Sequence, residues 1–253
     1  MVLGFTGWPD AGKVSSIALD YLTRSLKAEK VMEFRDEALY DLAYMRPLVR
    51  IEDGLMIDLK APSNVLYLWR SEELGKAILI LHGAEPSFDW KGYSMKILSI
   101  CEHADVKRIY MIGGVLDMIP HTRKPKITAV VNMDHLKEEI KLFGLTPSRY
   151  EGPASIHSYL MWLAREKGIE AISLWGHASN YIAAPNTITA LHLLRKLISM
   201  LGISIDLREL EESARRLELE VDEMAKRSPE LQQMIKSFEK MYDEEVGAPP
   251  YIA

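Results

Sequence analysis

Hydrophobic and polar positions alternate between strand-like and helix-like spacing over the first two hundred residues. Short apolar runs have the length of strands and lie at 2–6, 77–81, 108–112, 127–132 and 171–175. Between them, apolar residues repeat with helical spacing at 14–26, 92–103, 155–167 and 186–201. This alternation predicts a largely parallel sheet covered by helices on both faces. The run at 77–81 is apolar throughout, which favours a central strand buried on both sides.

The segment between the first predicted helix and this central strand has a different pattern. Residues 49–51 and 55–59 flank Asp53-Gly54, a dipeptide that favours a tight hairpin turn. Residues 65–69 form a further short apolar run. We therefore expect a small β-meander in this region.

A heptad-like pattern begins after Gly202. Asp206 followed by Glu209 resembles a helix-capping signature, and Ser228-Pro229 is typical of the start of a second helix. Apolar residues in the first of these helices are spaced by three and four, which predicts a helical hairpin that docks on the body or self-associates. The residues assigned to self-association are Leu207, Leu210, Leu217 and Val221.

Three regions follow from these patterns: an α/β domain at 1–205, a helical hairpin at 206–245 and an extended, flexible tail at 246–253.

The net charge of −5 is unevenly distributed, because residues 206–245 carry 13 acidic and 7 basic side chains and the remainder is near neutral. A body without a basic stripe lacks the charge distribution that nucleic-acid binding needs. Nucleic acid is therefore excluded as the main partner.

Composition indicates the cellular compartment of the chain. No run of about 18 apolar residues is available to cross a membrane, and the first residues lack the basic start of a secretory signal. The single cysteine, Cys101, cannot form an intramolecular disulfide or a thiolate metal cage. We expect a soluble, cytoplasmic protein without metal, cofactor or membrane partner.

The segment from Gly7 to Lys13 has the glycine and lysine spacing of a phosphate-binding loop between a strand and a helix. Magnesium binding there needs Ser or Thr directly after the lysine, but Val14 holds that position. One hypothesis is a nucleotide-binding enzyme that uses Gly7, Gly12 and Lys13. The other is a tight strand-to-helix connection in which the two glycines permit close backbone packing.

Histidines offer weaker candidates for chemistry. None forms the HxxxH or HExxH pair of a helical zinc site. His177 follows a predicted strand end, where α/β folds often bind ligands, and with His82 and Glu85 it could line a hydrolase or phosphorylase cleft. Asp134 is expected to be the N-cap of a helix at 136–143. No residue is assigned a catalytic role.

Five motifs in register resemble one known family. They are Gly7-Trp-Pro-Asp-Ala-Gly-Lys-Val14, Leu81-His-Gly-Ala-Glu-Pro86, Arg108-Ile-Tyr-Met-Ile-Gly-Gly-Val115 with Arg123-Lys-Pro-Lys126, Gly152-Pro-Ala-Ser-Ile-His-Ser-Tyr-Leu160, and Gly168 to His177 with Tyr181 and Pro185. Their order and spacing over residues 1–210 are similar to those of the proteasome-assembly-chaperone family typified by the second eukaryotic proteasome-assembly chaperone, particularly its archaeal relatives.

The resemblance implies a three-layer α/β/α sandwich of the phosphorylase/hydrolase-like kind with a C-terminal helical extension. It also implies a non-catalytic homo-oligomer that binds proteasome α-subunits or the 20S proteasome. Archaeal relatives have also been labelled ATP-grasp enzymes, so an ATP-dependent carboxylate–amine ligase is the alternative.

The C-terminal residues Tyr251, Ile252 and Ala253 partly match the hydrophobic-Tyr-any ending by which proteasome activators dock between α-subunits. The tyrosine is third from the end rather than penultimate. Docking by this tail and a frayed terminus therefore both stay open.

Overall fold

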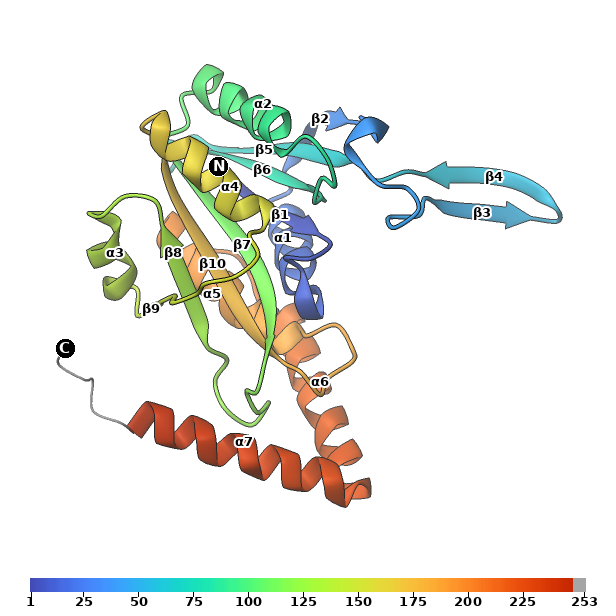
Figure 1. Ribbon diagram of the computed structural model, residues 1–253, viewed down its shortest axis with the longest axis vertical. Coiled ribbons are helices and arrows are strands. Elements are labelled where there is room, and N and C mark those ends of the chain that lie inside the picture. The colour runs from blue at the N-terminus through green and yellow to red at the C-terminus, as the bar shows by residue number, and fades with distance from the viewer. Residues whose placement is uncertain (248–253) are drawn as a thin grey trace.

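A mixed eight-stranded sheet forms the centre of the computed structural model, which describes residues 1–247 (Figure 1). Across the sheet the strand order is β2-β5-β6-β1-β7-β10-β8-β9. Strands β6, β1, β7 and β10 run parallel, whereas β5 pairs antiparallel with both β2 and β6, and β8 pairs antiparallel with β10. The bounds are β1 (Val2–Thr6), β2 (Glu29–Phe34), β5 (Asn64–Ser71), β6 (Lys76–Ala84), β7 (Arg108–Asp117), β8 (Ile127–Val131), β9 (Thr146–Pro147) and β10 (Glu170–Ser179).

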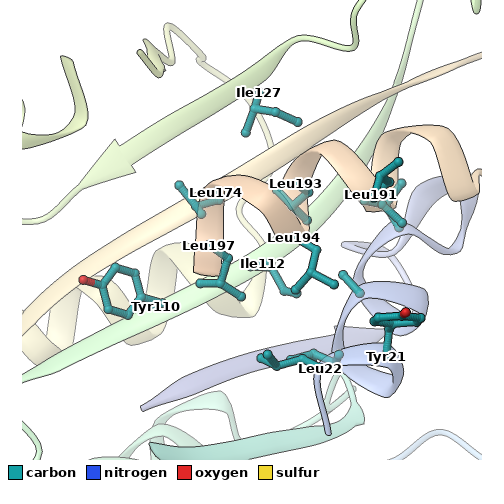
Figure 2. Packing of buried hydrophobic residues seen from close by; sticks show 14 of the residues in the cluster. Tyr21, Leu22, Tyr110, Ile112, Ile127, Leu174, Leu191, Leu193, Leu194 and Leu197 are labelled. Carbon is teal, nitrogen blue, oxygen red and sulfur yellow. The ribbon is translucent and has the colours of Figure 1, made fainter. Parts of the chain in front are cut away.

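Helices cover both faces of this sheet, which confirms the predicted three-layer α/β/α sandwich. One apolar cluster joins the sheet to α1 (Val14–Ser25), α5 (Thr187–Leu201) and α6 (Arg208–Arg227). Figure 2 shows the contact of α5 with the sheet, where Leu193 and Leu197 lie near Ile112 and Leu174. A second cluster joins the other face to α2 (Trp90–His103) and α4 (Ile156–Glu166). The short helix α3 (Leu136–Leu142) lies beside β8 and β9.

The predicted helical hairpin is present as α6 followed by α7 (Pro229–Gly247). Helix α6 starts one residue later than expected. Leu207 holds the N-cap position, and Asp206 lies one residue before the cap. The Asp206 carboxylate instead accepts a hydrogen bond from the backbone N–H of Arg208, at 3.0 Å. Similarly, His135 rather than Asp134 holds the N-cap position of α3, and the Asp134 carboxylate pairs with Lys137.

Several strand assignments differ from the sequence expectations. Gly113 and Gly114 lie inside β7 rather than at its end, and His177 lies inside β10. Strand β2 was not predicted, because its polar and apolar residues do not follow a clear period of two. The expected meander is wrong. Strands β3 (Leu48–Glu52) and β4 (Leu55–Lys60) form a separate two-stranded sheet, whereas β5 joins the main one.

No helix in residues 1–247 is both long enough and apolar enough to span a membrane.

Candidate functional site

The turn from Gly7 to Lys13 packs tightly against the neighbouring strands. Gly12 has φ 62°, and its carbonyl accepts a hydrogen bond from the N–H of Asn186 at 2.7 Å. The Pro9 carbonyl accepts another from the N–H of Gly114 in β7, at 2.8 Å. A Cβ at Gly12 would lie 3.0 Å from the Cβ of Ala178 in β10. The glycine at this position therefore permits close backbone packing, as the tight-connection hypothesis requires.

The side chain of Asp10 occupies the place that a phosphate would take in a nucleotide-binding loop. It is buried and accepts hydrogen bonds from the backbone N–H and the hydroxyl of Ser16, at 3.1 and 2.5 Å, in the first turn of α1. Burial raises the pKa of Asp10, and the hydrogen bonds from Ser16 oppose that rise. An internal carboxylate thus satisfies the positive end of the helix, where an external anion would otherwise bind.

Lys13 also departs from the nucleotide-binding arrangement. Its ammonium lies 3.8 Å from the Asp10 carboxylate, and its side chain is largely exposed. The geometry therefore gives no support to Gly7, Gly12 and Lys13 as a cofactor site of a nucleotide-binding enzyme.

The three residues considered for a hydrolase or phosphorylase cleft do not converge. Strands β6 and β10 are separated by β1 and β7, so His82 and His177 lie at least about 14 Å apart across the sheet. His82 pairs with Asp20 of α1 at 3.0 Å, and His177 pairs with Asp117 of β7 at 2.7 Å. The Glu85 carboxylate accepts a hydrogen bond from the backbone N–H that begins α4, at 2.9 Å. Each side chain has a separate structural partner, so this expectation is wrong.

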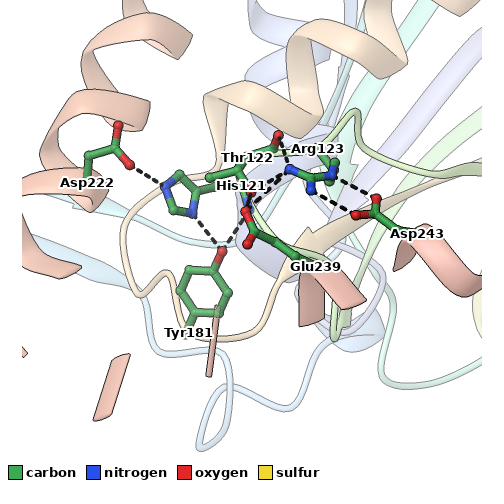
Figure 3. Close-up of polar contacts among 7 residues, drawn as sticks. All are labelled: His121, Thr122, Arg123, Tyr181, Asp222, Glu239 and Asp243. Atoms are coloured by element: carbon green, nitrogen blue, oxygen red, sulfur yellow. Dashed lines mark hydrogen bonds and ion pairs between the residues drawn. The ribbon is translucent and has the colours of Figure 1, made fainter. Parts of the chain in front are cut away.

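A polar cluster joins the loop after β7 to the C-terminal hairpin (Figure 3). The imidazole of His121 is buried between the hydroxyl of Tyr181 and the carboxylate of Asp222, at 2.7 and 3.2 Å. Arg123 makes two hydrogen bonds of 2.9 Å to Asp243 and one of 3.3 Å to Glu239. These contacts attach both α6 and α7 to the sheet.

Apolar contacts complete the attachment of the hairpin. Leu210, Leu217 and Val221 of α6 are buried in the same cluster as α5, and Leu207 packs against that cluster. Because the chain's own body covers these side chains, they are unavailable for the contact between copies that was expected of them. This corrects the self-association assignment, and the alternative of a docked hairpin is the one observed.

The hairpin of β3 and β4 projects from the body, and we call residues 48–60 the arm (Figure 1). Its register places Val49 opposite Leu59 and Ile51 opposite Met56, so these four side chains share one face. They are 52%, 58%, 61% and 62% exposed, in the order Val49, Leu59, Ile51, Met56. The other face is mixed: it carries ion pairs from Arg50 to Glu52 and from Lys60 to Asp58, and the exposed side chains of Leu48 and Leu55 lie opposite Lys60 and Glu52.

An apolar face on an isolated two-stranded ribbon is unusual, because two strands alone are at best marginally stable in water. Exposed contiguous apolar surface of this kind marks protein contact sites. The arm is therefore the candidate interaction surface of this chain.

Sequence reasoning located the hairpin turn of the arm but did not predict that the arm is exposed. The exposure follows from the sheet order, in which β4 pairs only with β3 and β5 belongs to the main sheet. Sequence reasoning also missed the roles of Asp10, His121 and Arg123. For Asp10, its place four residues before the start of α1 was a usable signal. For the other two, the partners are about 60 to 120 residues away in the sequence, so no local signal existed.

Within residues 1–247, no group of three or more His, Cys, Asp or Glu side chains is placed to hold a metal ion.

Solved structures with the same fold come from bacteria and archaea. The proteasome-assembly chaperone homologue Rv2125 of Mycobacterium tuberculosis is 28% identical with a TM-score of 0.84, over 92% of this chain and 98% of that one. A PAC2 family protein from Streptomyces avermitilis is 29% identical with a TM-score of 0.81, over the same shares of the two chains. PbaB of Pyrococcus furiosus, an archaeal proteasome activator, is 21% identical with a TM-score of 0.69, over 88% of this chain and 91% of that chain. At that identity, it shows the fold alone.

No match was found among curated proteins. The model of the PAC2 family, in contrast, matches residues 4–225, which include the Gly7–Lys13 turn, the arm and nearly all of α6. The chain belongs to the PAC2 family.

Proposed function

We propose that this chain is a non-catalytic, proteasome-assembly-chaperone-like protein that binds proteasome α-subunits or the 20S proteasome in the cytoplasm. The observation that carries the proposal is the arm, whose uncovered apolar face suits a protein partner. The family and the likeness to a proteasome-assembly chaperone homologue support the choice of partner.

The rest of the molecule suits a binding role. At the Gly7–Lys13 turn, the Asp10 carboxylate caps the helix start at which a phosphate would bind. The histidines at the strand ends pair with separate carboxylates. The sheet with its docked helices supplies a scaffold from which the arm can reach a partner.

Variants of the arm test this function directly. Ile51→Ser with Leu59→Ser removes two side chains from the apolar face, and Arg50→Ser with Asp58→Ser removes a cross-strand pair from the mixed face as the matched control. Because buried apolar anchors carry much of an interface's affinity, we expect the first variant to weaken binding to purified α-subunits at least about tenfold. Calorimetry or surface plasmon resonance measures this loss.

The control should bind nearly as the natural chain does, and both variants should keep its circular dichroism spectrum. No measurable binding of the natural chain to α-subunits or to 20S particles, over a range of salt concentration and temperature, would refute the proposed function.

Homo-oligomerisation and docking by Tyr251, Ile252 and Ala253 are part of the same proposal. The tail residues lie outside the described part of the chain, so their role rests on the sequence. Because the buried faces of α6 are covered within one chain, a contact between copies must use other surfaces, and the exposed face of the arm is the first to test. Light scattering of the natural chain and of the Ile51→Ser, Leu59→Ser variant compares their masses in solution.

A further inference from the structure

A broad open cleft lies at the base of the arm, where the carboxyl ends of β1 and β6 meet the connection from β4 to β5. Its volume is about 570 Å³. Thr6 ends β1, Gly83 and Ala84 end β6, and residues 60–63 form the near wall. The cleft is therefore built from the rigid centre of the sheet and opens beside the arm.

Three cations line this cleft, and no carboxylate is among the lining residues of the described chain. They are Lys13, Arg46 and Lys60. The nearest carboxylate contacts are long, at 3.8 Å from Lys13 to Asp10 and 3.7 Å from Lys60 to Asp58. Within residues 1–247, Arg46 makes no ion pair. Such a concentration of positive charge, in a protein whose net charge is −5, attracts an anionic group to the cleft.

The backbone beside the cleft favours carboxylates over phosphate. A phosphate site uses several free backbone N–H groups at a helix start. In the neighbouring turn, the N–H of Asp10 bonds to the Gly7 carbonyl, that of Lys13 to the Asp10 carbonyl, and that of Ser16 to the Asp10 carboxylate. The groups left to bind an anion are therefore the side-chain cations. The apolar side chains of Met45, Leu48 and Pro62 lie alongside them.

We propose that this cleft binds an acidic peptide segment of a partner protein, with its carboxylates on Lys13, Arg46 and Lys60 and its apolar side chains on the wall that continues into the arm. The inference deepens the proposed function, since it specifies the chemistry of the partner segment. It does not require that the partner be a proteasome subunit.

The test uses the full chain and a short fluorescein-labelled peptide of alternating glutamate and leucine, with a glutamine-for-glutamate peptide as control. We expect fluorescence anisotropy to show the glutamate peptide binding at least about tenfold more tightly, with an affinity that falls as salt rises. The double change Arg46→Gln and Lys60→Gln should weaken it about tenfold, since hydrogen bonds to charged groups are among the stronger ones. Lys91→Gln, at an exposed position on α2, should leave it unchanged.

Equal binding of the two peptides, or no loss in the double variant, would overturn the inference. Displacement of the peptide by inorganic phosphate at a similar concentration would also overturn it, because the cleft would then be a small-anion site. If the peptide binds as expected but α-subunits do not, the proteasome proposal fails while the acidic-peptide site stands.

Discussion

The substitution Phe238→Ala should release α7 from the body without unfolding the protein. Ile235 and Phe238 are the buried side chains of α7 in the described residues, and Phe238 packs on Tyr181 with ring centroids 6.0 Å apart. Truncation of a buried Phe to Ala costs roughly 3–5 kcal/mol, and the peripheral position of this ring favours the lower end. A cost of about 3 kcal/mol corresponds to a change of more than a hundredfold in the docking equilibrium.

The polar contacts of α7 cannot make up this loss. The pairs from Arg123 to Asp243 and Glu239 are partly exposed, and exposed ion pairs contribute little to stability. The stability of a helix in a protein comes mostly from the packing of its apolar face, so α7 loses most of its support when it leaves the body. Undocking of α7 should therefore be accompanied by loss of its helical hydrogen bonds.

Hydrogen exchange measured by mass spectrometry is the direct assay. Amides of α7 should exchange about a hundredfold faster in the variant, whereas amides of β7 and β10 should keep their protection because they pair within the sheet. Met241→Ala is the matched control, since that side chain lies on the same helix and is 45% exposed. Unchanged exchange of α7 in Phe238→Ala, or an equal effect of Met241→Ala, would refute the reasoning.

Four further predictions address the core, the turn, a buried histidine and the tail. Leu217→Ala should lower the free energy of unfolding by about 2–5 kcal/mol in urea titrations, because the side chain is buried under α5. Gly12→Ala should lower it by roughly 1–3 kcal/mol, because the position has φ 62° and its new Cβ would press on Ala178; a thermal melt checks this. Burial lowers the pKa of His157 to about 3, so stability should fall as pH drops from 6.5 towards 3, where the unfolded chain binds the proton first; His157→Gln should flatten that part of the urea midpoint against pH. Deletion of 251–253 should weaken binding to α-subunits and leave the melting temperature unchanged, and equal affinity of the two forms would remove the tail from the interface.

The fold was predictable from the sequence wherever hydrophobic spacing alone decides an element. Central strands such as β6 are continuous apolar runs, and α5 carries a strong amphipathic pattern with Gly202 ending it in a left-handed conformation. Both features depend on neighbouring residues only. The predicted layers and helical hairpin followed from them.

The candidate site was less predictable, because the arm and the docked helices depend on contacts between segments far apart in the sequence. These contacts decide which strands lie outside the main sheet and which helices pack on it. Residues 49–51 and 55–59 have the composition of buried strands, yet they form the exposed arm. Conversely, Leu217 and Val221 have the spacing of a coiled-coil contact but pack on the chain's own body. In each case the local pattern indicates that a segment has an apolar face. Only the tertiary arrangement shows whether that face packs on the chain's own body or stays exposed.

The order of strands also has a consequence for how a newly made chain folds on the ribosome. Strand β1 is synthesised first, but its neighbours in the sheet are β6 and β7, so Val2 must find Ile80 and Tyr110. At roughly 5–20 residues per second, the second of these partners emerges several seconds to some twenty seconds after the first strand. Until then, one edge of β1 is unpaired on the nascent chain. Because unpaired strand edges favour aggregation, the nascent chain is expected to be most prone to aggregate before residue 110 has emerged.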